Sequence, residues 1–382
     1  MAVVTTNKTH SILIPNNDLS RYASKRSLQW GSAVEKVLQS GIYLQGQNVS
    51  DFENSFSSFC GTHLGVGVAN GTDALELSLR ASGCGPGTEV IVTGNSGSYG
   101  TIASIAVGAT PVIIDVTSNG LMDSSLVSEA VTSKTRAIIA THLYGQSADI
   151  TAIRRELSEN VVVIEDVAQA HGATQSEGMA GGLGDLSCFS FYPTKNLGGF
   201  GDGGFVTGRS QELIGVVKEL AQYGWSSKYK INRPYGRNSR LDEIQAAVLQ
   251  IELDNLVVRN RRRTSIAAAL VQEIPHEFRV TPASSDDPSY VGHLCVVRHP
   301  ERKRVVERLL ANGIATSIHY PVPDHLQSGL KGMVRVATQL DTTEGLCGEV
   351  ISLPNFPELL DSEVDFMAGV LRQVFRKYHN GQ

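Results

Sequence analysis

The stretch NVVVIEDVAQA, residues 160–170, predicts a buried β-strand that ends in two carboxylates, Glu165 and Asp166. Its apolar, β-branched residues follow one another without the alternation of a half-exposed strand. Such an unbroken run is typical of a strand covered on both faces, as in a parallel sheet. A pair of acids after such a run is usually a solvated turn, and a functional role is the alternative.

Runs of the same kind lie on both sides of this stretch, separated by helical patterns. They are EVIV (89–92), TPVIIDV (110–116), TRAIIATHLYG (135–145) and GGFVTG (203–208). This alternation predicts an α/β fold whose sheet is mostly parallel and sandwiched by helices. Ligands of such sheets gather at the carboxyl ends of the strands, so the residues that follow each run are the candidates for a site.

A long helical pattern begins at Ser239 in SRLDEIQAAVLQIELDNLVV, where Ser239 and Asp242 match a capping box. Beyond about residue 256 the glycine density falls. We therefore expect a large domain over 1–255 and a smaller α+β domain over 256–382, with the first 30 or so residues free to pack on the small domain.

The closing segment DSEVDFMAGVLRQVF predicts a helix that buries one face. The apolar residues at helical spacing are Val364, Met367, Leu371 and Val374.

The composition indicates a soluble globular protein. The 382 residues are 41% hydrophobic and 19% charged, with a formal net charge of -5, which favours a sizeable core and gives no electrostatic footprint for nucleic acid. The one dense basic run, Arg259 with Arg261, Arg262 and Arg263, falls in a helical pattern. We expect a solvated helix face there.

The five cysteines are scattered and have no metal-ligand spacing, so we expect free thiols in a reducing compartment and no metal site. There is no apolar run long enough for a membrane span and no signal-peptide pattern. A cytoplasmic location is the default expectation.

The stretch ANGTDALELSLRASG (69–83) places Gly71 and Thr72 directly before a helical pattern. Free N–H groups and a hydroxyl at a helix N-terminus form an anion site that suits phosphate. The alternative is a simple N-cap at Thr72 or Asp73.

The stretch SFYPTKNLGGFGDGGF (190–205) contains one lysine among five glycines and several aromatic and hydroxyl residues. Gly199, Gly201 and Gly204 formally fit GxGxxG, but a predicted strand rather than a helix follows them, so the dinucleotide fingerprint is rejected. The glycines instead indicate tight turns beside Lys195 and a backbone that passes close to something bulky.

Lys195 has no carboxylate near it in sequence, and burial would lower its pKa toward the range in which the amine is a nucleophile. A single lysine is usually a solvated surface charge. Schiff-base chemistry with pyridoxal phosphate would also need a carboxylate for the pyridine nitrogen and donors for the phosphate. Asp166 supplies the first, and Gly71, Thr72 and Ser190 supply the second.

Taken in order, these motifs resemble the DegT/StrS family of sugar aminotransferases, fold-type-I pyridoxal phosphate enzymes that act on nucleotide-linked keto sugars. The resemblance covers nearly the whole chain. Besides the stretches already quoted, it is carried by SGIYLQGQNVSDFE (40–53), GATPVIIDV (108–116), THLYGQSADI (141–150), GRNSRLDEIQAAVL (236–249), GIATSIHYPVPDHLQ (313–327) and SLPNFPEL (352–359).

The resemblance implies that Lys195 bonds to the cofactor and later moves the proton between cofactor and sugar, while Asp166 pairs with the pyridinium nitrogen. Gln169 would approach the cofactor's 3′-oxygen. The phosphate would be held by Gly71, Thr72 and Ser190, joined by Asn238 from a neighbouring subunit, which requires a homodimer with shared active sites. His319 and Tyr320 would approach the sugar nucleotide; packing of an interdomain hinge is the alternative.

One departure from the family concerns the cofactor ring. Family members often carry an aromatic that stacks on the ring, and TGNSGSYG (93–100) has Gly97 at the aligned place. Tyr99 is the nearest aromatic.

The resemblance implies transfer of an amino group from L-glutamate to C3 or C4 of a nucleotide-linked keto-deoxy sugar, favoured to be dTDP-linked, for amino-sugar biosynthesis. A sugar dehydratase is an alternative, but dehydratases of one type have His in place of the lysine, and Lys195 argues against it. A non-catalytic regulator that binds pyridoxal phosphate would leave the complete set of site residues unexplained. A nucleotide-dependent oxidoreductase rests only on the rejected glycine match.

Overall fold

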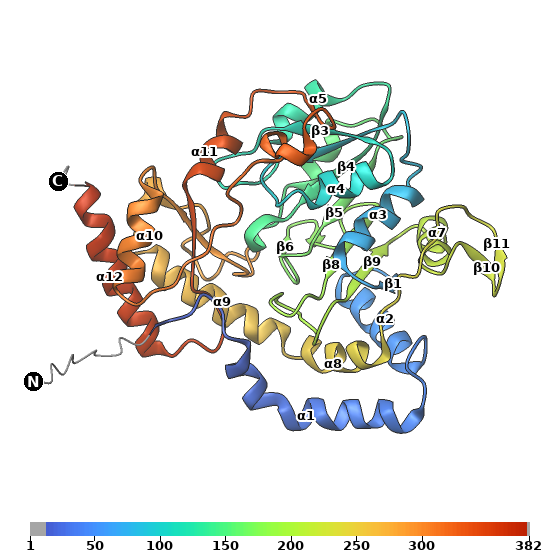
Figure 1. Cartoon of the computed structure of the whole chain (residues 1–382), viewed down its shortest axis with the longest axis horizontal. Helices are drawn as coiled ribbons and strands as arrows, with labels where there is room; N and C mark the ends of the chain where they lie inside the picture. Colours follow the sequence, from blue (N-terminus) through green and yellow to red (C-terminus); the bar gives the residue numbers. More distant parts are fainter. Residues whose placement is uncertain (1–12, 380–382) are drawn as a thin grey trace, which may run out of the picture.

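One central sheet of eight strands forms the body of the protein in the computed structural model, which describes residues 13–379 (Figure 1). The strand order is β1-β9-β8-β5-β4-β2-β3-β13. The strands are β1 (Leu64–Val68), β2 (Glu89–Thr93), β3 (Thr110–Ile114), β4 (Thr135–Thr141), β5 (Val162–Asp166), β8 (Leu186–Ser190), β9 (Gly204–Gly208) and β13 (Arg335–Val336). Only β9 runs antiparallel to its neighbours, which confirms the predicted α/β class and the mostly parallel sheet.

All five predicted runs contain strands of this sheet, and three strands were missed, β1, β8 and the two-residue β13. β1 was missed because its sequence, LGVGV, has glycine at every second position. β8, with the sequence LSCFS, mixes hydroxyl and apolar residues although four of its five residues are buried. Both edges of β8 are hydrogen-bonded to neighbouring strands, so tertiary pairing outweighs its weak local pattern.

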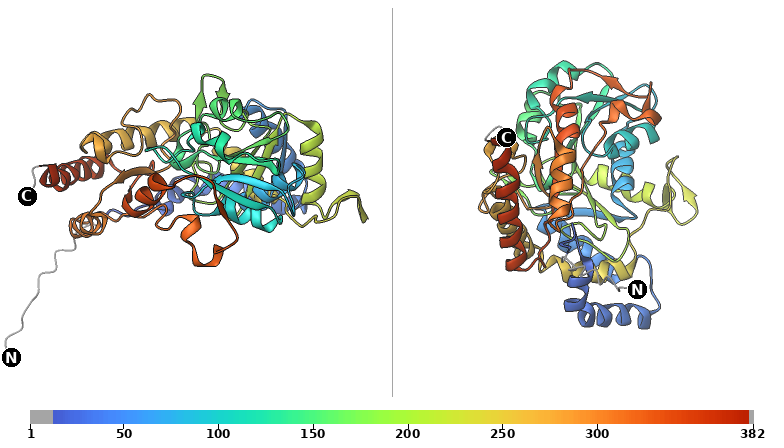
Figure 2. Two further views of the ribbon diagram at one scale, coloured as in Figure 1. Left: turned by 90° about the horizontal axis from the view of Figure 1, so that it is seen from above. Right: turned by 60° about the vertical axis from the view of Figure 1, so that its left-hand side comes forward.

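Helices cover both faces of the sheet (Figure 2). On one face, α3 (Gly71–Ala81), α4 (Tyr99–Ala106) and α7 (Gln211–Ala221) pack on a core that includes Val92 and Ile164. On the other, apolar residues pack beneath α2 (Gln47–Phe59), α5 (Val127–Ala130), α6 (Ile150–Arg155) and α8 (Glu243–Leu253). Neighbours along a strand therefore enter different cores, as the unbroken apolar runs require.

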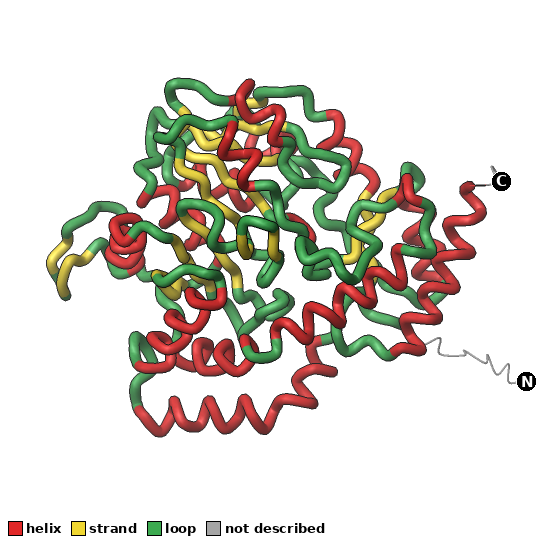
Figure 3. The backbone as a smooth tube through the Cα atoms, turned by 180° about the vertical axis from the view of Figure 1, so that it is seen from behind, coloured by secondary structure: helices red, strands yellow, loops and turns green. Residues whose placement is uncertain are grey.

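The C-terminal part has a core of its own. It is built from α9 (Leu256–Val271), β12 (Cys295–Arg298), α10 (Arg302–Ala311), β14 (Val350–Leu353) and α12 (Asp361–His379). Helix α11 (Asp341–Glu349) precedes β14, and its Leu346 packs in a separate cluster with Val116 and Leu143. The predicted apolar face of α12 is confirmed, because Val364, Met367, Leu371 and Val374 are all buried. In Figure 3, loops lie between the strands of the central sheet and these C-terminal helices.

The beginning of the described chain contacts this C-terminal part. Ile14 is buried in its core and its N–H donates to Gly313 O at 2.8 Å. Arg21 forms an ion pair of 2.7 Å with Glu363. Residues 1–12 of the predicted N-terminal packing segment lie outside the described residues, and the division of the chain near residue 255 stays a prediction.

One long helix, two hairpins and several short turns complete the fold. Helix α1 (Leu19–Ser40) runs beside α8 (Figure 1). The hairpin of β10 (Trp225–Ser227) and β11 (Lys230–Ile231) projects from the body, and a second hairpin joins β6 (Thr174–Gln175) to β7 (Gly178–Met179). The 3₁₀ turns are η1 (Ser124–Leu126), η2 (Leu143–Gly145), η3 (His276–Phe278), η4 (Asp324–Leu326) and η5 (Ser328–Leu330).

The predicted capping box at Ser239 and Asp242 is wrong. Helix α8 begins only at Glu243, and the Asp242 side chain makes no capping hydrogen bond. Ser239 is buried, and its hydroxyl instead accepts from the N–H of Ala69, at 3.0 Å. Glu243 serves the start of a different helix, since its carboxylate accepts from three residues at the N-terminus of α2, Gly46, Asn48 and Val49.

The predicted solvated face of the arginine run is also wrong for most of the run. Arg263 is only 4% exposed. Arg259 pairs with Glu358 at 2.7 Å, and Arg262 pairs with Asp361 at 2.7 Å. Only Arg261 is exposed. A charge run with helical spacing does not reveal that a second segment, here the one leading into α12, lies across the helix.

All five cysteines are free, as predicted, and all are buried. Between residues 13 and 379 there is no helix with the length and apolarity needed to cross a bilayer.

Candidate active site

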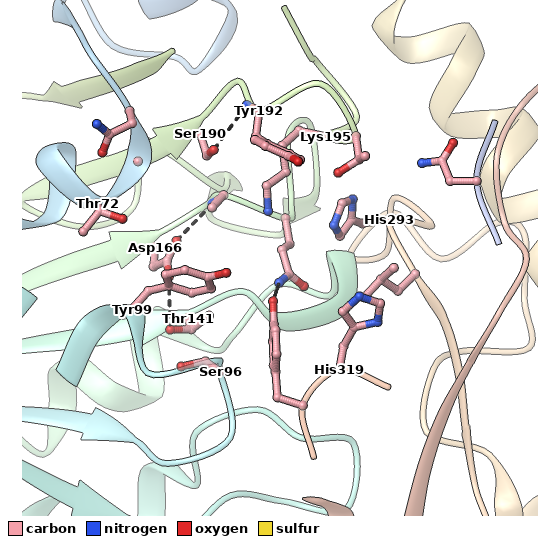
Figure 4. Close-up of a pocket in the computed structure, with 18 of the residues that line it drawn as sticks. Thr72, Ser96, Tyr99, Thr141, Asp166, Ser190, Tyr192, Lys195, His293 and His319 are labelled. Atoms are coloured by element: carbon pink, nitrogen blue, oxygen red, sulfur yellow. Dashed lines mark hydrogen bonds between the residues drawn. The ribbon is translucent and has the colours of Figure 1, made fainter. Parts of the chain in front are cut away.

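A cavity of about 560 Å³ lies at the carboxyl edge of the sheet, where β4, β5 and β8 end and α3 begins (Figure 4). Most of the predicted site residues line it: Gly71, Thr72, Tyr99, Asp166, Gln169, Ser190, Lys195, His319 and Tyr320. They come from segments far apart in sequence, and the parallel strand ends bring them to one place. The sequence predicts that these residues lie together.

Lys195 reaches the cavity from the loop that joins β8 to β9. The loop is fixed by its own backbone, with Lys195 N–H donating to Tyr192 O and Gly199 N–H donating to Phe191 O, both at 2.8 Å. Burial lowers the pKa of Lys195 to about 8, and attraction to Asp166 opposes part of this effect. A fraction of the amine is therefore neutral near neutral pH and able to act as a nucleophile.

Asp166 is the last residue of β5 and points into the same cavity (Figure 4). It is 5% exposed, so the solvated turn expected of such acids does not form. Burial raises the pKa of Asp166, while a hydrogen bond of 3.1 Å from the Ala168 N–H and the charge of Lys195 oppose the rise. Within residues 13–379 no ion pair joins Asp166 to Lys195, so the carboxylate faces the cavity without a direct cationic partner.

Glu165, one residue earlier on β5, points the other way and is fully buried. Its carboxylate accepts from the N–H groups of Leu183 and Gly184, at 2.9 and 2.8 Å, and from the Ser187 hydroxyl, at 2.7 Å. His142 lies 2.9 Å from it and its other ring nitrogen accepts from Ala148 N–H, so Nε2 donates to Glu165. Glu165 is therefore structural, and Asp166 alone is left for chemistry.

The start of α3 forms an anion site beside Ser190. Asn70 is the N-cap, and its side chain accepts from Asp73 N–H at 2.8 Å. The alternative of a cap at Thr72 or Asp73 is thereby wrong, and Thr72 keeps its hydroxyl for the cavity. A Cβ added at Gly71 would lie 2.8 Å from Cβ of Ser190, so only glycine lets the helix start and the end of β8 approach this closely.

Gln169 is held on two sides. Its Oε1 accepts from Tyr144 N–H at 2.7 Å, and its Nε2 donates to the hydroxyl of Tyr320 at 3.1 Å. His319, next to Tyr320, has Nδ1 2.8 Å from the Ser352 hydroxyl, and burial lowers its pKa. Both His319 and Tyr320 line the cavity and do not merely pack between the two parts of the protein.

Gly97 leaves a space that two tyrosine rings fill. A Cβ at Gly97 would lie 2.9 Å from the Tyr99 ring and 2.9 Å from the Tyr320 ring. These rings contact each other edge to face, with centroids 6.3 Å apart. Tyr99 is 45% exposed, and its ring lies beside Asp166 and Thr141 in Figure 4. Both tyrosine rings thus lie where a side chain at position 97 would have to go.

Asn238 is the one predicted residue that lies outside the cavity. It is exposed, and its backbone pairs with that of Gln222 in an isolated bridge.

The glycines after Lys195 lie where the backbone passes close to other parts of the chain, as predicted. A Cβ at Gly198 would lie 2.6 Å from Pro193 O, and one at Gly199 would lie 2.5 Å from Gln245 Oε1. Gly204 abuts the backbone of Asn70. The neighbours that these glycines accommodate are the Lys195 loop, a side chain of α8 and the residue before α3.

Some residues of the cavity were missed by the sequence analysis. The loop that joins β8 to β9 contributes Tyr192, Thr194 and Asp202 to the cavity. Their closeness in sequence to Lys195 could have indicated them. Asn16, Asn17, His293 and Asn355 have no local signal, because they reach the cavity only through the packing of the C-terminal part.

Comparisons with known proteins agree with this geometry. The model of the DegT/DnrJ/EryC1/StrS aminotransferase family matches residues 29–372. A dTDP-3-amino-3,6-dideoxy-alpha-D-galactopyranose transaminase from Aneurinibacillus thermoaerophilus is 42% identical over 355 residues, which are 92% of this chain and 97% of that protein.

Solved structures show the same fold. S. venezuelae DesV, crystallised in complex with a ketimine intermediate, has a TM-score of 0.89 and 38% identity, covering 95% of this chain and 98% of that one. NtdA from Bacillus subtilis, solved with bound cofactor PMP, has a TM-score of 0.87 and 26% identity, covering 97% of this chain and 86% of that one. The fold is that of DegT-family aminotransferases.

Proposed function

Because this chain belongs to the DegT/DnrJ/EryC1/StrS aminotransferase family, we propose that it uses pyridoxal phosphate to move an amino group from L-glutamate to C3 of a dTDP-linked 6-deoxy keto sugar. The observation that carries the proposal is the buried amine of Lys195, with its pKa lowered to about 8, in one cavity with the buried carboxylate of Asp166. The choice of dTDP and of C3 is supported by the name of the Aneurinibacillus relative.

The residues of the cavity fit pyridoxal phosphate. Gly71, Thr72 and Ser190 form a cradle that a Cβ at Gly71 would close, and the N-terminus of α3 favours a phosphate there. Asp166 faces the cavity with its charge uncompensated by an ion pair, as a partner of a pyridinium nitrogen should. When bound, the cofactor supplies a carbonyl that accepts the amino group and a ring that withdraws electrons.

Each residue then has a part in the transfer. Lys195 would hold the cofactor through its amine and would move the proton to and from the reacting carbon. The negative charge of Asp166 would favour a protonated ring nitrogen. Gln169, fixed by Tyr144 and Tyr320, would offer its amide to the cofactor's 3′-oxygen. His319 and Tyr320 face the sugar side.

The proposal includes a homodimer in which Asn238 of one subunit completes the phosphate site of the other. Its support is that Asn238 is exposed and outside its own subunit's cavity. The neighbouring hairpin also exposes large apolar side chains, with Tyr229 78%, Ile231 69% and Tyr235 74% exposed, as expected of a surface that a partner covers. A cytoplasmic location is proposed with it, in line with five free thiols.

The test uses ¹⁵N-labelled L-glutamate with dTDP-linked 3-keto and 4-keto sugars and their UDP-linked counterparts, with the products followed by mass spectrometry. We expect label in the amino sugar from the dTDP-linked 3-keto substrate. We also expect glutamate alone to yield one 2-oxoglutarate per site, because the two half-reactions are separate. Failure of every sugar to accept label, with protein that retains its cofactor, contradicts the proposal.

Gly71→Ala is expected to weaken cofactor retention about tenfold or more, because the added Cβ meets Ser190 and pushes apart the two sides of the phosphate cradle. The dissociation constant of pyridoxal phosphate, measured from its visible absorption, checks this. Gly215→Ala is the matched control, since a Cβ there, in α7, meets nothing within 4 Å. Equal affinities for the two variants would show that the cradle is not where the phosphate binds.

Tyr99→Ala is expected to weaken cofactor binding about three- to tenfold, the usual effect of losing one aromatic stacking contact. Tyr99→Phe keeps the ring and should bind like the wild type. Both are measured by the same titration, together with the circular dichroism of the bound cofactor, which reports how firmly its ring is held. If Tyr99→Ala leaves both quantities unchanged, another group covers the ring.

A further inference from the structure

A second cavity, of about 300 Å³, lies on the other side of the lysine loop, between α1 and α9. It shares Asn17 and Lys195 with the main cavity. Four aromatic residues line it, Tyr22, Trp30, Phe200 and Phe356. Trp30 is in edge-to-face contact with Tyr22 and Phe200 at centroid distances of 5.3 and 4.8 Å. The roles proposed so far leave this cavity unused.

Arg263 lines this second cavity and is only 4% exposed. Its Nη1 donates to the backbone oxygen of Asn355 at 2.8 Å, while its buried Nε has no hydrogen-bond partner among the described residues. Burial lowers the pKa of Arg263 to about 10, and repulsion by Arg259 adds to the effect. Burying a guanidinium with an unused N–H donor lowers the stability of the folded protein unless an anion accepts from that donor.

The carboxylates of the cavity already have partners. Glu358 pairs with Arg259 at 2.7 Å. Glu252 accepts from the Trp30 indole at 2.8 Å and from the Tyr22 hydroxyl, and Arg26 lies 3.5 Å from it. Of the two arginines in this lining, Arg263 is therefore the one that the described acids leave without an ion-pair partner. The other unpaired cation of the lining, Lys195, is the residue assigned to the cofactor.

Arg263 also adjoins the wall of the main cavity. Its Nη1 donates to the backbone oxygen of Asn355, and Asn355 lines the main cavity. Lys195 lines both cavities. The unpaired guanidinium and the reacting lysine therefore share the lining of the second cavity.

We propose that the second cavity binds a carboxylate of the amino-acid donor, or of its 2-oxo acid product, through Arg263. This inference rests on the proposed aminotransfer. A guanidinium fork matches a carboxylate in bidentate geometry. One uncompensated cation balances one carboxylate, whereas a nucleotide diphosphate would bring more negative charge than this lining can neutralise.

The experiment titrates glutarate, a dicarboxylate without an amino group, into the holoenzyme and follows the fluorescence of Trp30. The chain has two tryptophans, so a Trp225→Phe background isolates the signal. We expect Arg263→Met to weaken glutarate binding about tenfold to a hundredfold, since a charged hydrogen-bonding partner is lost. Arg263→Lys should weaken it less, because the charge remains and the fork is lost.

Arg261→Met is the matched control, because Arg261 is exposed on the same helix and should leave glutarate binding unchanged. Wild-type affinity for glutarate in Arg263→Met overturns the inference, and so does a loss of dTDP binding without a loss of glutarate binding. If Arg263→Met does not fold, Arg263→Lys decides. Glutarate binding needs no sugar and no turnover, so its outcome is independent of whether the sugar substrate has been named correctly.

Discussion

Lys195→Ala is expected to lower the rate of amino transfer by about 10⁴-fold or more, because the variant loses both the amine that bonds to the cofactor and the group that moves the proton. The measurement is the rate of ¹⁵N transfer from glutamate to the sugar. Lys218→Ala, on α7, is a control that removes a lysine outside the main cavity. Substantial transfer by Lys195→Ala would refute the assigned chemistry.

The same variant should change the pH dependence of stability in the cofactor-free protein. The pKa of Lys195 is lowered on folding, from 10.5 to about 8, so the folded state binds fewer protons than the unfolded state between these values. The free energy of unfolding contributed by this group therefore rises with pH from about 8 to 10.5. Urea unfolding at several pH values should show this rise for the wild type relative to Lys195→Ala.

Asp166→Asn is expected to lower transfer by about 10²- to 10³-fold, the usual cost of removing one well-placed electrostatic group. Asparagine keeps the shape but not the negative charge, so the pyridine nitrogen would no longer be held protonated. The variant should therefore show a changed visible spectrum as well as a lower rate of 2-oxoglutarate release from glutamate. Wild-type values for both would show that the charge of Asp166 has no such role.

Much of the fold was predictable because its strands are buried on both faces. The unbroken apolar runs of β2, β3, β4 and β5 are typical of strands covered on both faces. β8 could not be found in this way, since its hydroxyl side chains are bonded within the interior, as Ser187 is to Glu165. The predicted solvated face of the arginine run of α9 was wrong for a related reason, because its charges pair with a segment almost 100 residues away.

The candidate site was predictable to the extent that strand ends define it. Asp166 follows from the rule that parallel strands present their carboxyl ends together, and Lys195 from its isolation among glycines. Ser190 ends the missed strand β8 and was predicted only as part of the stretch that contains Lys195. Asn16 and His293 could not be derived, because they reach the cavity through long-range packing. The glycines predicted a close approach but not its partner, since sequence does not tell whether a bare backbone faces a ligand or another part of the same chain.

The opposite orientations of Glu165 and Asp166 bear on how faithfully the protein must fold. In a strand, a slip of one residue moves every side chain to the other face. A slipped β5 would bring Asp166 toward the interior and turn Glu165 toward the cavity, and the N–H groups of Leu183 and Gly184 would lose their acceptor. The hydrogen bonds of Glu165 thus destabilise the slipped register, which would give a compact but inactive molecule. The strand pairing that stabilises the sheet therefore also keeps Asp166 in the cavity.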